Sequence, residues 1–308
     1  MAEASGGQLR VARRSEVPAE LDKRKHRTLF QDARRRFLHN RLAIFGLVIV
    51  STFVFVAVFA DLIAPYAYDQ ADFTKVRWLP MRDMAHPLGT DEVGRDYLSR
   101  LMYGARTSLT VGLVVMSFAV LVGVPLGGLA GYYGGKVDFV ISRIIDIMTA
   151  FPGLLFSILV ITLYGGGTTM VIFALSITSW IGIARLTRAQ FLSLREKEFI
   201  ESARAMGVPQ RSIIFRHLLP NAMSPILVAV SFGIPAVIFA EAGLSFLGIG
   251  INDPIPSWGK MVGIAGSYVR VSWHMALFPT LAIALTMLGF AFVGDGLRDA
   301  LDPKLTTR

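Results

Sequence analysis

Six apolar segments constrain this chain more than any other feature of its sequence. Each can cross roughly 30 Å of hydrocarbon at about 1.5 Å per helical residue, although the fourth is short for this purpose. Of the 308 residues, 53% are hydrophobic and only 17% are charged. A soluble core cannot bury so much apolar surface, so the sequence predicts an all-α polytopic membrane protein of about six transmembrane helices. The expected spans are 42–64, 107–132, 139–164, 168–184, 225–250 and 273–293.

The distribution of basic residues predicts the orientation of these spans. Lys and Arg collect on the cytoplasmic side of membrane proteins. Residues 1–41 hold 11 of the 31 basic residues, and the loop 185–224 holds seven. Both are therefore expected in the cytoplasm, and six spans place the C-terminus there too, in a multi-pass protein of the cytoplasmic (inner) membrane. The outer loop 65–106 is mixed, with six basic and six acidic residues.

The two ends of the chain differ from the transmembrane domain, which is expected over 42–303. Residues 1–25 are polar and mixed in charge, which is typical of a disordered tail, and 304–308 form a short C-terminal tail. In residues 26–41 the apolar side chains fall on one helical face and three consecutive arginines lie off it. This pattern predicts an amphipathic helix on the membrane surface, with a solvated basic linker as the alternative.

The sequence disfavours a nucleotide or metal site on this chain. The nearest candidate for a phosphate-binding loop, 131–137, would need Gly at 130 and Ser or Thr at 137. The chain has Ala130 and Val137 there. It has no cysteine, and its five histidines are far apart in sequence, so no metal-ligand spacing is present. We therefore expect no catalytic residues, no metal and no cofactor.

An intramembrane serine protease is the best alternative among enzymes. Ser245 lies in the fifth span and His274 opens the sixth, so a nucleophile and a base on neighbouring helices are conceivable. The strained turn typical of such a serine would need Gly at 247, where the chain has Leu247. Small residues within a span are more often a sign of close helix packing.

The loop 185–224 is the most informative segment. A helical pattern leads to Gly207, which is expected to end a helix, and Pro209 is expected to begin a second one. The loop therefore predicts a short helix-turn-helix held between two spans on the cytoplasmic face. A DNA-binding role is one interpretation, but a module tethered at both ends to a bilayer cannot easily enter a groove of DNA. Docking to a soluble protein partner is favoured, and no nucleic-acid partner is expected.

The same loop resembles the signature of ABC-importer permeases, E-A-A-x3-G-x9-I-x-L-P. Ser202 replaces the first Ala and His217 replaces the Ile, whereas Glu201, Ala203, Gly207, Leu219 and Pro220 match in register. Other stretches are similar to the dipeptide, oligopeptide and nickel branch of this family, and the pattern is most similar to its C-type dipeptide permease. These stretches are H-P-L-G-T-D at 86–91, G-R-D at 94–96, G-Y-Y-G-G at 131–135, E-A-G-L-S-F-L-G at 241–248 and P-S-W-G at 256–259.

The resemblance implies the architecture and partners of a type I ABC importer. A second, homologous permease would complete the pore, two ATP-binding cassette subunits would bind ATP and Mg, and an external solute-binding protein would deliver the ligand. Transport of di- or oligopeptides would follow by alternating access. The loop would hold the coupling helix, with its ATPase contact at Glu201, Ser202, Ala203, Arg204, Gly207 and Pro209.

Two further groups of polar residues are candidate sites. Glu241 lies deep in the fifth span, where a carboxylate is by default a functional candidate. With Ser245 it could line the pathway or hydrogen-bond a neighbouring helix, and the second interpretation is favoured. In the outer loop Asp91, Arg95 and Asp96 are expected on a helix running into the second span. They could contact the solute-binding protein, or the segment could rest on the membrane lipid.

A stand-alone channel or secondary transporter is the main alternative of a different class. It predicts paired half-helices or internal repeats, which the sequence does not display, and it has no need of the loop 185–224. The sequence does not distinguish dipeptides, oligopeptides, nickel complexes and sugars as the substrate.

Overall fold

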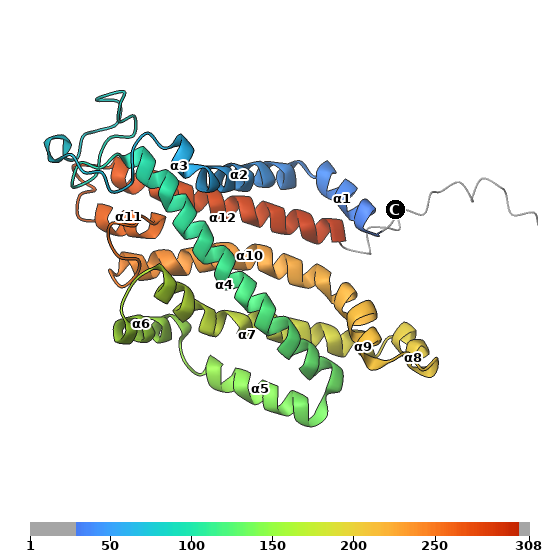
Figure 1. The fold of residues 1–308 in the computed structure, drawn as a ribbon. Coiled ribbons are helices and arrows are strands. Elements are labelled where there is room, and N and C mark those ends of the chain that lie inside the picture. Colours follow the sequence, from blue (N-terminus) through green and yellow to red (C-terminus); the bar gives the residue numbers. More distant parts are fainter. Residues whose placement is uncertain (1–28, 302–308) are drawn as a thin grey trace, which may run out of the picture.

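The computed structural model describes residues 29–301, with side chains described from residue 33 onward. Within this part of the chain the protein is helical and contains no β-strand (Figure 1). A 3₁₀ turn, η2 (Phe73–Lys75), and a π-helical turn, η3 (Ile213–Leu218), accompany the helices. The α-helices are α1 (Leu29–His39), α2 (Arg41–Val58), α3 (Ala60–Ile63), α4 (Tyr97–Tyr133), α5 (Gly135–Thr149), α6 (Gly153–Tyr164), α7 (Thr168–Arg195), α8 (Glu198–Ala205), α9 (Gln210–Ser212), α10 (Leu219–Phe246), α11 (Trp258–Ala265) and α12 (His274–Leu301).

Five of the described helices are long and apolar enough to span a membrane, which agrees with five of the six predicted segments. Their ends differ from the expected ones: the second begins at Tyr97 and the fourth continues to Arg195, so the fourth is not short, whereas the first already ends at Val58. The five are Arg41–Val58, Tyr97–Tyr133, Thr168–Arg195, Gln210–Phe246 and His274–Leu301.

The third predicted span is not one continuous helix. It consists of α5 and α6, which are bent by 74° at a short break. The break contains Pro152, which lacks a backbone N–H and disfavours helical geometry at Phe151 before it. The prediction of a single helix over 139–164 was therefore wrong, although the pair together is long enough to count as a sixth span.

The bundle is held by close contacts between small residues. In Figure 1, α4 crosses the other long helices obliquely, and its C-terminal half lies along α7. Gly123, Gly127 and Gly131 recur every four residues on the face of α4 that meets α7. A Cβ at any of them would lie less than 3.0 Å from atoms of α7. Such small-residue stripes allow helices to approach closely where lipid removes the hydrophobic drive for packing.

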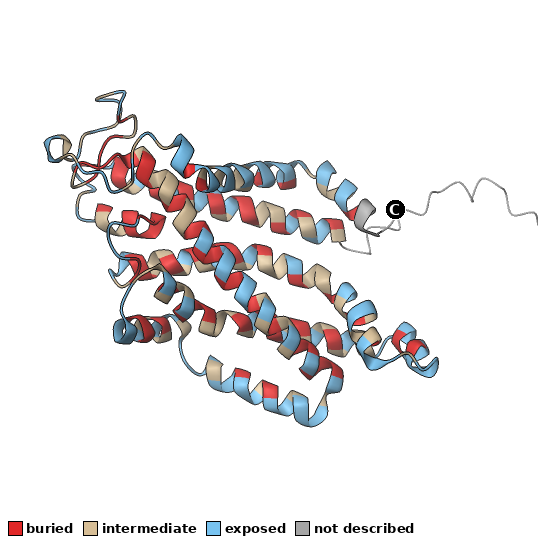
Figure 2. Ribbon diagram, viewed as in Figure 1, coloured by how far each residue is buried: buried red, intermediate tan, exposed pale blue. Residues whose placement is uncertain are grey.

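The bundle exposes much apolar surface, as Figure 2 shows on α2, α5 and α6. In the most apolar window of Arg41–Val58 only 17% of the residues are buried. Apolar side chains on the outside of such a helix are suited to lipid or to another membrane subunit.

The amphipathic helix expected over 26–41 is present as α1. Arg34 and Arg35 are exposed, while the ring of Phe37 packs beside Gly296 of α12. The apolar face of α1 therefore lies at least partly against the bundle, and a position on the membrane surface stays a prediction. The predicted tails 1–25 and 304–308 lie outside the described residues.

Candidate coupling and pathway sites

The loop between α7 and α10 forms a small helical projection at one end of the bundle (Figure 1). Its helix, α8, is separated from α7 by two residues and buries Ile200 and Ala203 against neighbouring elements. Phe199 on α8 and Met206 directly after it are exposed. Two large apolar side chains on a solvent-facing helix favour docking to another protein.

The exposed side of this projection carries most of the predicted coupling residues. Glu201, Ser202, Arg204, Gly207 and Pro209 are exposed. Ala203 is the exception, since its methyl group is buried and lets α8 lie close to the rest of the loop. The structure thus brings the six residues together on one short segment, and their contact with an ATPase stays a prediction.

The predicted helix stop at Gly207 is confirmed. Gly207 has a φ of +76°, a conformation that residues with a Cβ rarely adopt. The amide of Val208 donates to the Ala203 carbonyl at 3.1 Å, and the Gly207 amide donates to the Arg204 carbonyl at 3.0 Å. These bonds satisfy the carbonyls that a helix end leaves free. Pro209 then caps the start of α9, as the sequence predicts.

The second helix of the loop is not a separate short helix. Residues Gln210–Phe246 run as one continuous helix through η3 into the fifth span, which corrects the helix-turn-helix prediction. In a regular α-helix the ring of Pro220 would clash with the carbonyl of Arg216. The wider π turn directly before it accommodates the ring and keeps the helix continuous.

Glu241 lies near the other end of this helix and has no exposed surface. Its Oε1 accepts hydrogen bonds from the Ser245 and Ser257 hydroxyls, both at 2.8 Å, and Oε2 accepts one from the Ser108 hydroxyl at 3.3 Å. Ser108 belongs to α4, and Ser257 caps the start of α11. One carboxyl group therefore ties α4, α10 and α11 together.

The same serines also hold backbone groups of α11. The Ser108 hydroxyl accepts from the Trp258 amide at 3.2 Å, and the Ser257 hydroxyl accepts from the Lys260 amide at 3.2 Å. Ser108 and Ser257 could not be recognised from the sequence, since Ser108 is 133 residues from Glu241 and serines are common in spans. The arrangement favours the helix-packing interpretation of Glu241 and Ser245 over a pathway lining.

Ser245 and His274 have different partners. Ser245 donates to Glu241, while Nε2 of His274 lies 3.3 Å from the Thr90 carbonyl. The described part of the chain thus gives no support to a serine–histidine pair.

The three outer-loop candidates are buried and precede α4, so the helix expected there was wrong for these positions. Asp96 instead caps α4, accepting from the Ser99 amide at 2.7 Å. Asp91 accepts from Arg95 Nε at 2.5 Å and lies 3.2 Å from Arg100 Nε. These side chains hold the outer loop together. A contact with a solute-binding protein would therefore involve exposed residues beside them, and it stays a prediction.

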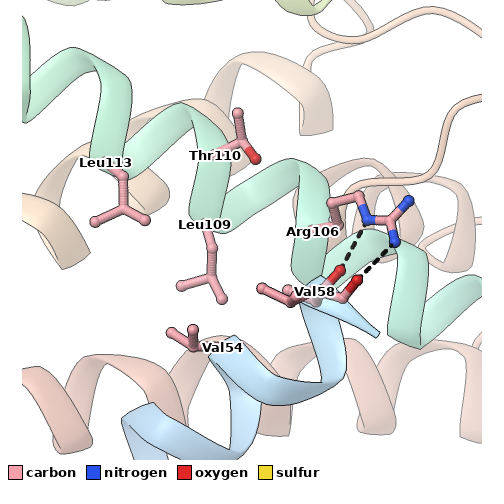
Figure 3. A pocket seen from close by; sticks show the side chains of 7 residues that line it. Val54, Val58, Arg106, Leu109, Thr110 and Leu113 are labelled. Carbon is pink, nitrogen blue, oxygen red and sulfur yellow. Dashed lines mark hydrogen bonds between the residues drawn. The ribbon is translucent and has the colours of Figure 1, made fainter. Parts of the chain in front are cut away.

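Arg106 joins the outer loop region to the end of α2 (Figure 3). Its Nε donates to the Ala57 carbonyl at 2.8 Å, and Nη2 donates to Asp61 Oδ2 at 2.9 Å and to the Val58 carbonyl at 3.3 Å. A cation at a helix C-terminus satisfies its free carbonyls and complements its dipole. The hydrogen bond from Arg106 also holds the pKa of Asp61 below its usual value. An apolar hollow of about 260 Å³, lined by Val54, Leu109 and Leu113 among others, lies beside this clamp.

Comparison with known proteins identifies the family. The family described as "binding-protein-dependent transport system inner membrane component" matches residues 123–307. A second family, the "N-terminal TM domain of oligopeptide transport permease C", matches residues 28–80.

The chain belongs to the binding-protein-dependent transport permeases.

Curated relatives are similar in sequence to this permease over about 90% of its length. The oligopeptide transport permease OppC of Haemophilus influenzae is 39% identical over 90% of this chain and 89% of its own. The dipeptide transport permease DppC of Alkalihalophilus pseudofirmus is 41% identical over 90% of both chains. The glutathione transport permease GsiD of Pectobacterium atrosepticum is 42% identical over 91% of this chain and 92% of its own. This permease is therefore a multi-pass inner-membrane subunit of an ABC importer, as the resemblance implied.

Solved structures share the fold of this permease. The inward-facing MetNI methionine ABC transporter matches with a TM-score of 0.54 and 22% identity, over 66% of this chain and 96% of that one. An amino acid ABC transporter matches with a TM-score of 0.53 and 18% identity, over 66% of this chain and 94% of that one. These likenesses confirm the type I importer fold expected from the sequence.

Proposed function

We propose that this permease moves di- or oligopeptides across the inner membrane by alternating access, driven by ATP that other subunits hydrolyse. The printed functions of its relatives support a peptide substrate, since oligopeptide and dipeptide permeases recur among them at about 40% identity over 90% of the chain. A related small solute is the next candidate substrate, because the glutathione permease is as similar to this chain as the peptide permeases are.

The observation that carries the mechanism is the exposed projection α8. It is a short rigid helix with a defined stop at Gly207, and it presents Phe199 and Met206 to a partner. A rigid element can transmit a displacement, whereas a flexible loop absorbs it. Two ATP-binding cassette subunits would dock below, one on this permease and one on its homologous partner. ATP and Mg would bind to those subunits, and this chain would bind no cofactor.

The remaining partners and the orientation follow from the same proposal. A second permease would complete the pore, and an external solute-binding protein would deliver the peptide. With α8 in the cytoplasm, the N- and C-termini would be cytoplasmic and Glu241 would lie toward the outer side, since it is at the other end of the Gln210–Phe246 helix.

The test is a tagged purification of this chain from detergent, followed by peptide uptake in proteoliposomes. Two ATPase subunits and a second permease should copurify, and vesicles with the binding protein should accumulate a labelled di- or tripeptide only with ATP. A chain that purifies alone as a homo-oligomer would exclude the importer proposal. A complete complex that ignores peptides but moves another solute would exclude only the substrate.

A further inference from the structure

Three charged side chains are exposed where α5 of the broken third span faces α7. Arg143 and Asp146 belong to α5, and Arg185 belongs to α7. Arg143 Nη1 lies 3.5 Å from Asp146 Oδ2, and Arg185 Nη2 lies 3.9 Å from Asp146 Oδ1. Their side chains are 63%, 55% and 51% exposed. We call these three residues the mid-span charge cluster.

The position of the cluster along α5 places it within the inner half of the third span. The helix begins at Gly135, directly after α4 ends, and Asp146 follows eleven residues later. Counted from residue 139, where the expected span begins, Asp146 lies seven residues, or about 10 Å, inside a hydrocarbon core of about 30 Å. Arg185 reaches the same depth, because its Nη2 donates to the Thr149 hydroxyl at 2.9 Å.

Exposed charges at this depth cannot face lipid at low energy. Ionisable side chains within membrane spans face a protein interior or a water-filled cavity, because the hydrocarbon does not solvate them. The break between α5 and α6 begins directly after Thr149. Broken helices at the middle of a membrane occur where the backbone lines a cavity, and transporters use them to bind substrates.

A second ion pair between the same helices serves as a comparison. Arg188 binds Asp138 through two hydrogen bonds, with Nη2 at 2.7 Å from Oδ2, and the Asp138 side chain is mostly buried. In that pair one guanidinium group binds one carboxylate, so the two charges balance. In the mid-span charge cluster two guanidinium groups share one carboxylate at longer distances, which leaves a net positive charge that can attract another anion.

We propose that the mid-span charge cluster lines the water-filled translocation pathway and that Arg185 binds the terminal carboxylate of the passing peptide. The guanidinium matches a carboxylate in shape and charge. The peptide part of this inference rests on the proposed function, whereas the pathway part does not.

The absence of cysteine from the chain gives a direct test of the pathway part. Single variants Asp146→Cys and Ile144→Cys would be made in the assembled transporter and labelled in membrane vesicles with a charged, membrane-impermeant thiol reagent. Ile144 is the matched control: it is exposed and at nearly the same depth, but about 160° around α5 from Asp146. We expect Asp146→Cys to react at least about tenfold faster than Ile144→Cys, since thiols react as water-solvated thiolates. Equal rates, or no labelling of either variant, would overturn the proposal.

The carboxylate part is tested by uptake of a labelled dipeptide in competition with free-acid and amidated peptides. Arg185→Gln should raise KM for the free acid by roughly tenfold, as expected for a lost charged hydrogen bond, while the subunits still copurify as an assembled transporter. It should also abolish the preference for the free acid over the amide, and Arg185→Lys should restore part of it. An unchanged KM and preference would overturn this part. If the wild-type transporter takes up no peptide, the proposed function fails, while the labelling rates still report on the pathway.

Discussion

Glu241 is a carboxyl group whose described partners are hydroxyls and not cations. Each of its three serines comes from a different segment, so the energetic role of the group is to hold those segments in register. Removing a buried acceptor leaves its donors unpaired, at about 1–3 kcal/mol for each group. Two substitutions of Glu241 therefore separate a structural role from a transport role.

Glu241→Gln keeps one carbonyl oxygen for Ser245 and Ser257 and offers an amide to Ser108, so near-normal uptake is expected. Glu241→Leu leaves all three hydroxyls without their acceptor and should destabilise the permease by a few kcal/mol. Thermal unfolding of the purified transporter and initial uptake rates would measure both variants. A stable Glu241→Gln protein with abolished uptake would instead assign the carboxylate to the pathway.

Gly207 is the residue on which the shape of the coupling projection depends. Gly207→Ala forces a Cβ into the left-handed region, at about 1–2 kcal/mol, and should misplace the end of α8. We expect reduced uptake per ATP hydrolysed. Gly182→Ala is the matched control, because Gly182 lies within α7 with no atom near the added Cβ. Equal coupling ratios in the two variants would argue against a role of this turn.

Asp61 gives a prediction about pH. The hydrogen bond from Arg106 lowers the pKa of Asp61 in the folded protein. The pair therefore contributes its full stabilisation of the folded state above the unfolded pKa of about 3.9, and this stabilisation is lost as the pH falls through the lower folded pKa. Asp61→Asn should thus lower the unfolding temperature at pH 6, and this deficit should shrink as the pH falls below about 3.9. Asp69→Asn, which changes another exposed carboxylate of the same loop, is the control. A deficit that stays constant between pH 6 and pH 3 would contradict the assignment.

At the scale of elements, the sequence predicted helices better than their junctions. Apolar length located five spans, and Gly207 and Pro209 marked a real turn. The break in the third span has no clear sequence signal, because prolines 125, 225 and 235 lie inside continuous helices of the same bundle whereas Pro152 lies at the break. A separate short helix was predicted after Pro209 because the π turn, which lets the helix continue into the fifth span, has no clear sequence signal.

The contact between α4 and α7 carries a prediction of its own. Gly127→Leu would push a branched side chain into the backbone of Ala184, and overpacking of this kind costs roughly 1–3 kcal/mol or more. We expect poor expression and a lower unfolding temperature in detergent. Gly153→Ala is a suitable control, since its Cβ would meet only ordinary contacts at Thr178. An unaffected Gly127→Leu protein would show that the two helices can separate freely.

At the scale of the whole molecule, the candidate sites differ in how far the sequence could foresee them. The coupling projection is local, so its six residues could be read from one segment. The Glu241 site depends on Ser108, and the mid-span charge cluster depends on Arg185, both brought in from other helices. Contacts over such separations arise from helix packing, which residue spacing within one segment does not encode.

The helix Gln210–Phe246 connects the coupling projection to the Glu241 site without interruption. Mechanically it is a lever arm of about 55 Å, at about 1.5 Å per residue, with the softer π turn close to its driven end. A tilt of about 10° about that end would sweep the far tip through about 9 Å, a rigid-body amplification of the kind used in switching proteins. Glu241 ties the tip of this helix to α4 and α11, so those two segments would have to move with it. A displacement that begins at the coupling projection would therefore move three segments, and not one, at the opposite membrane face.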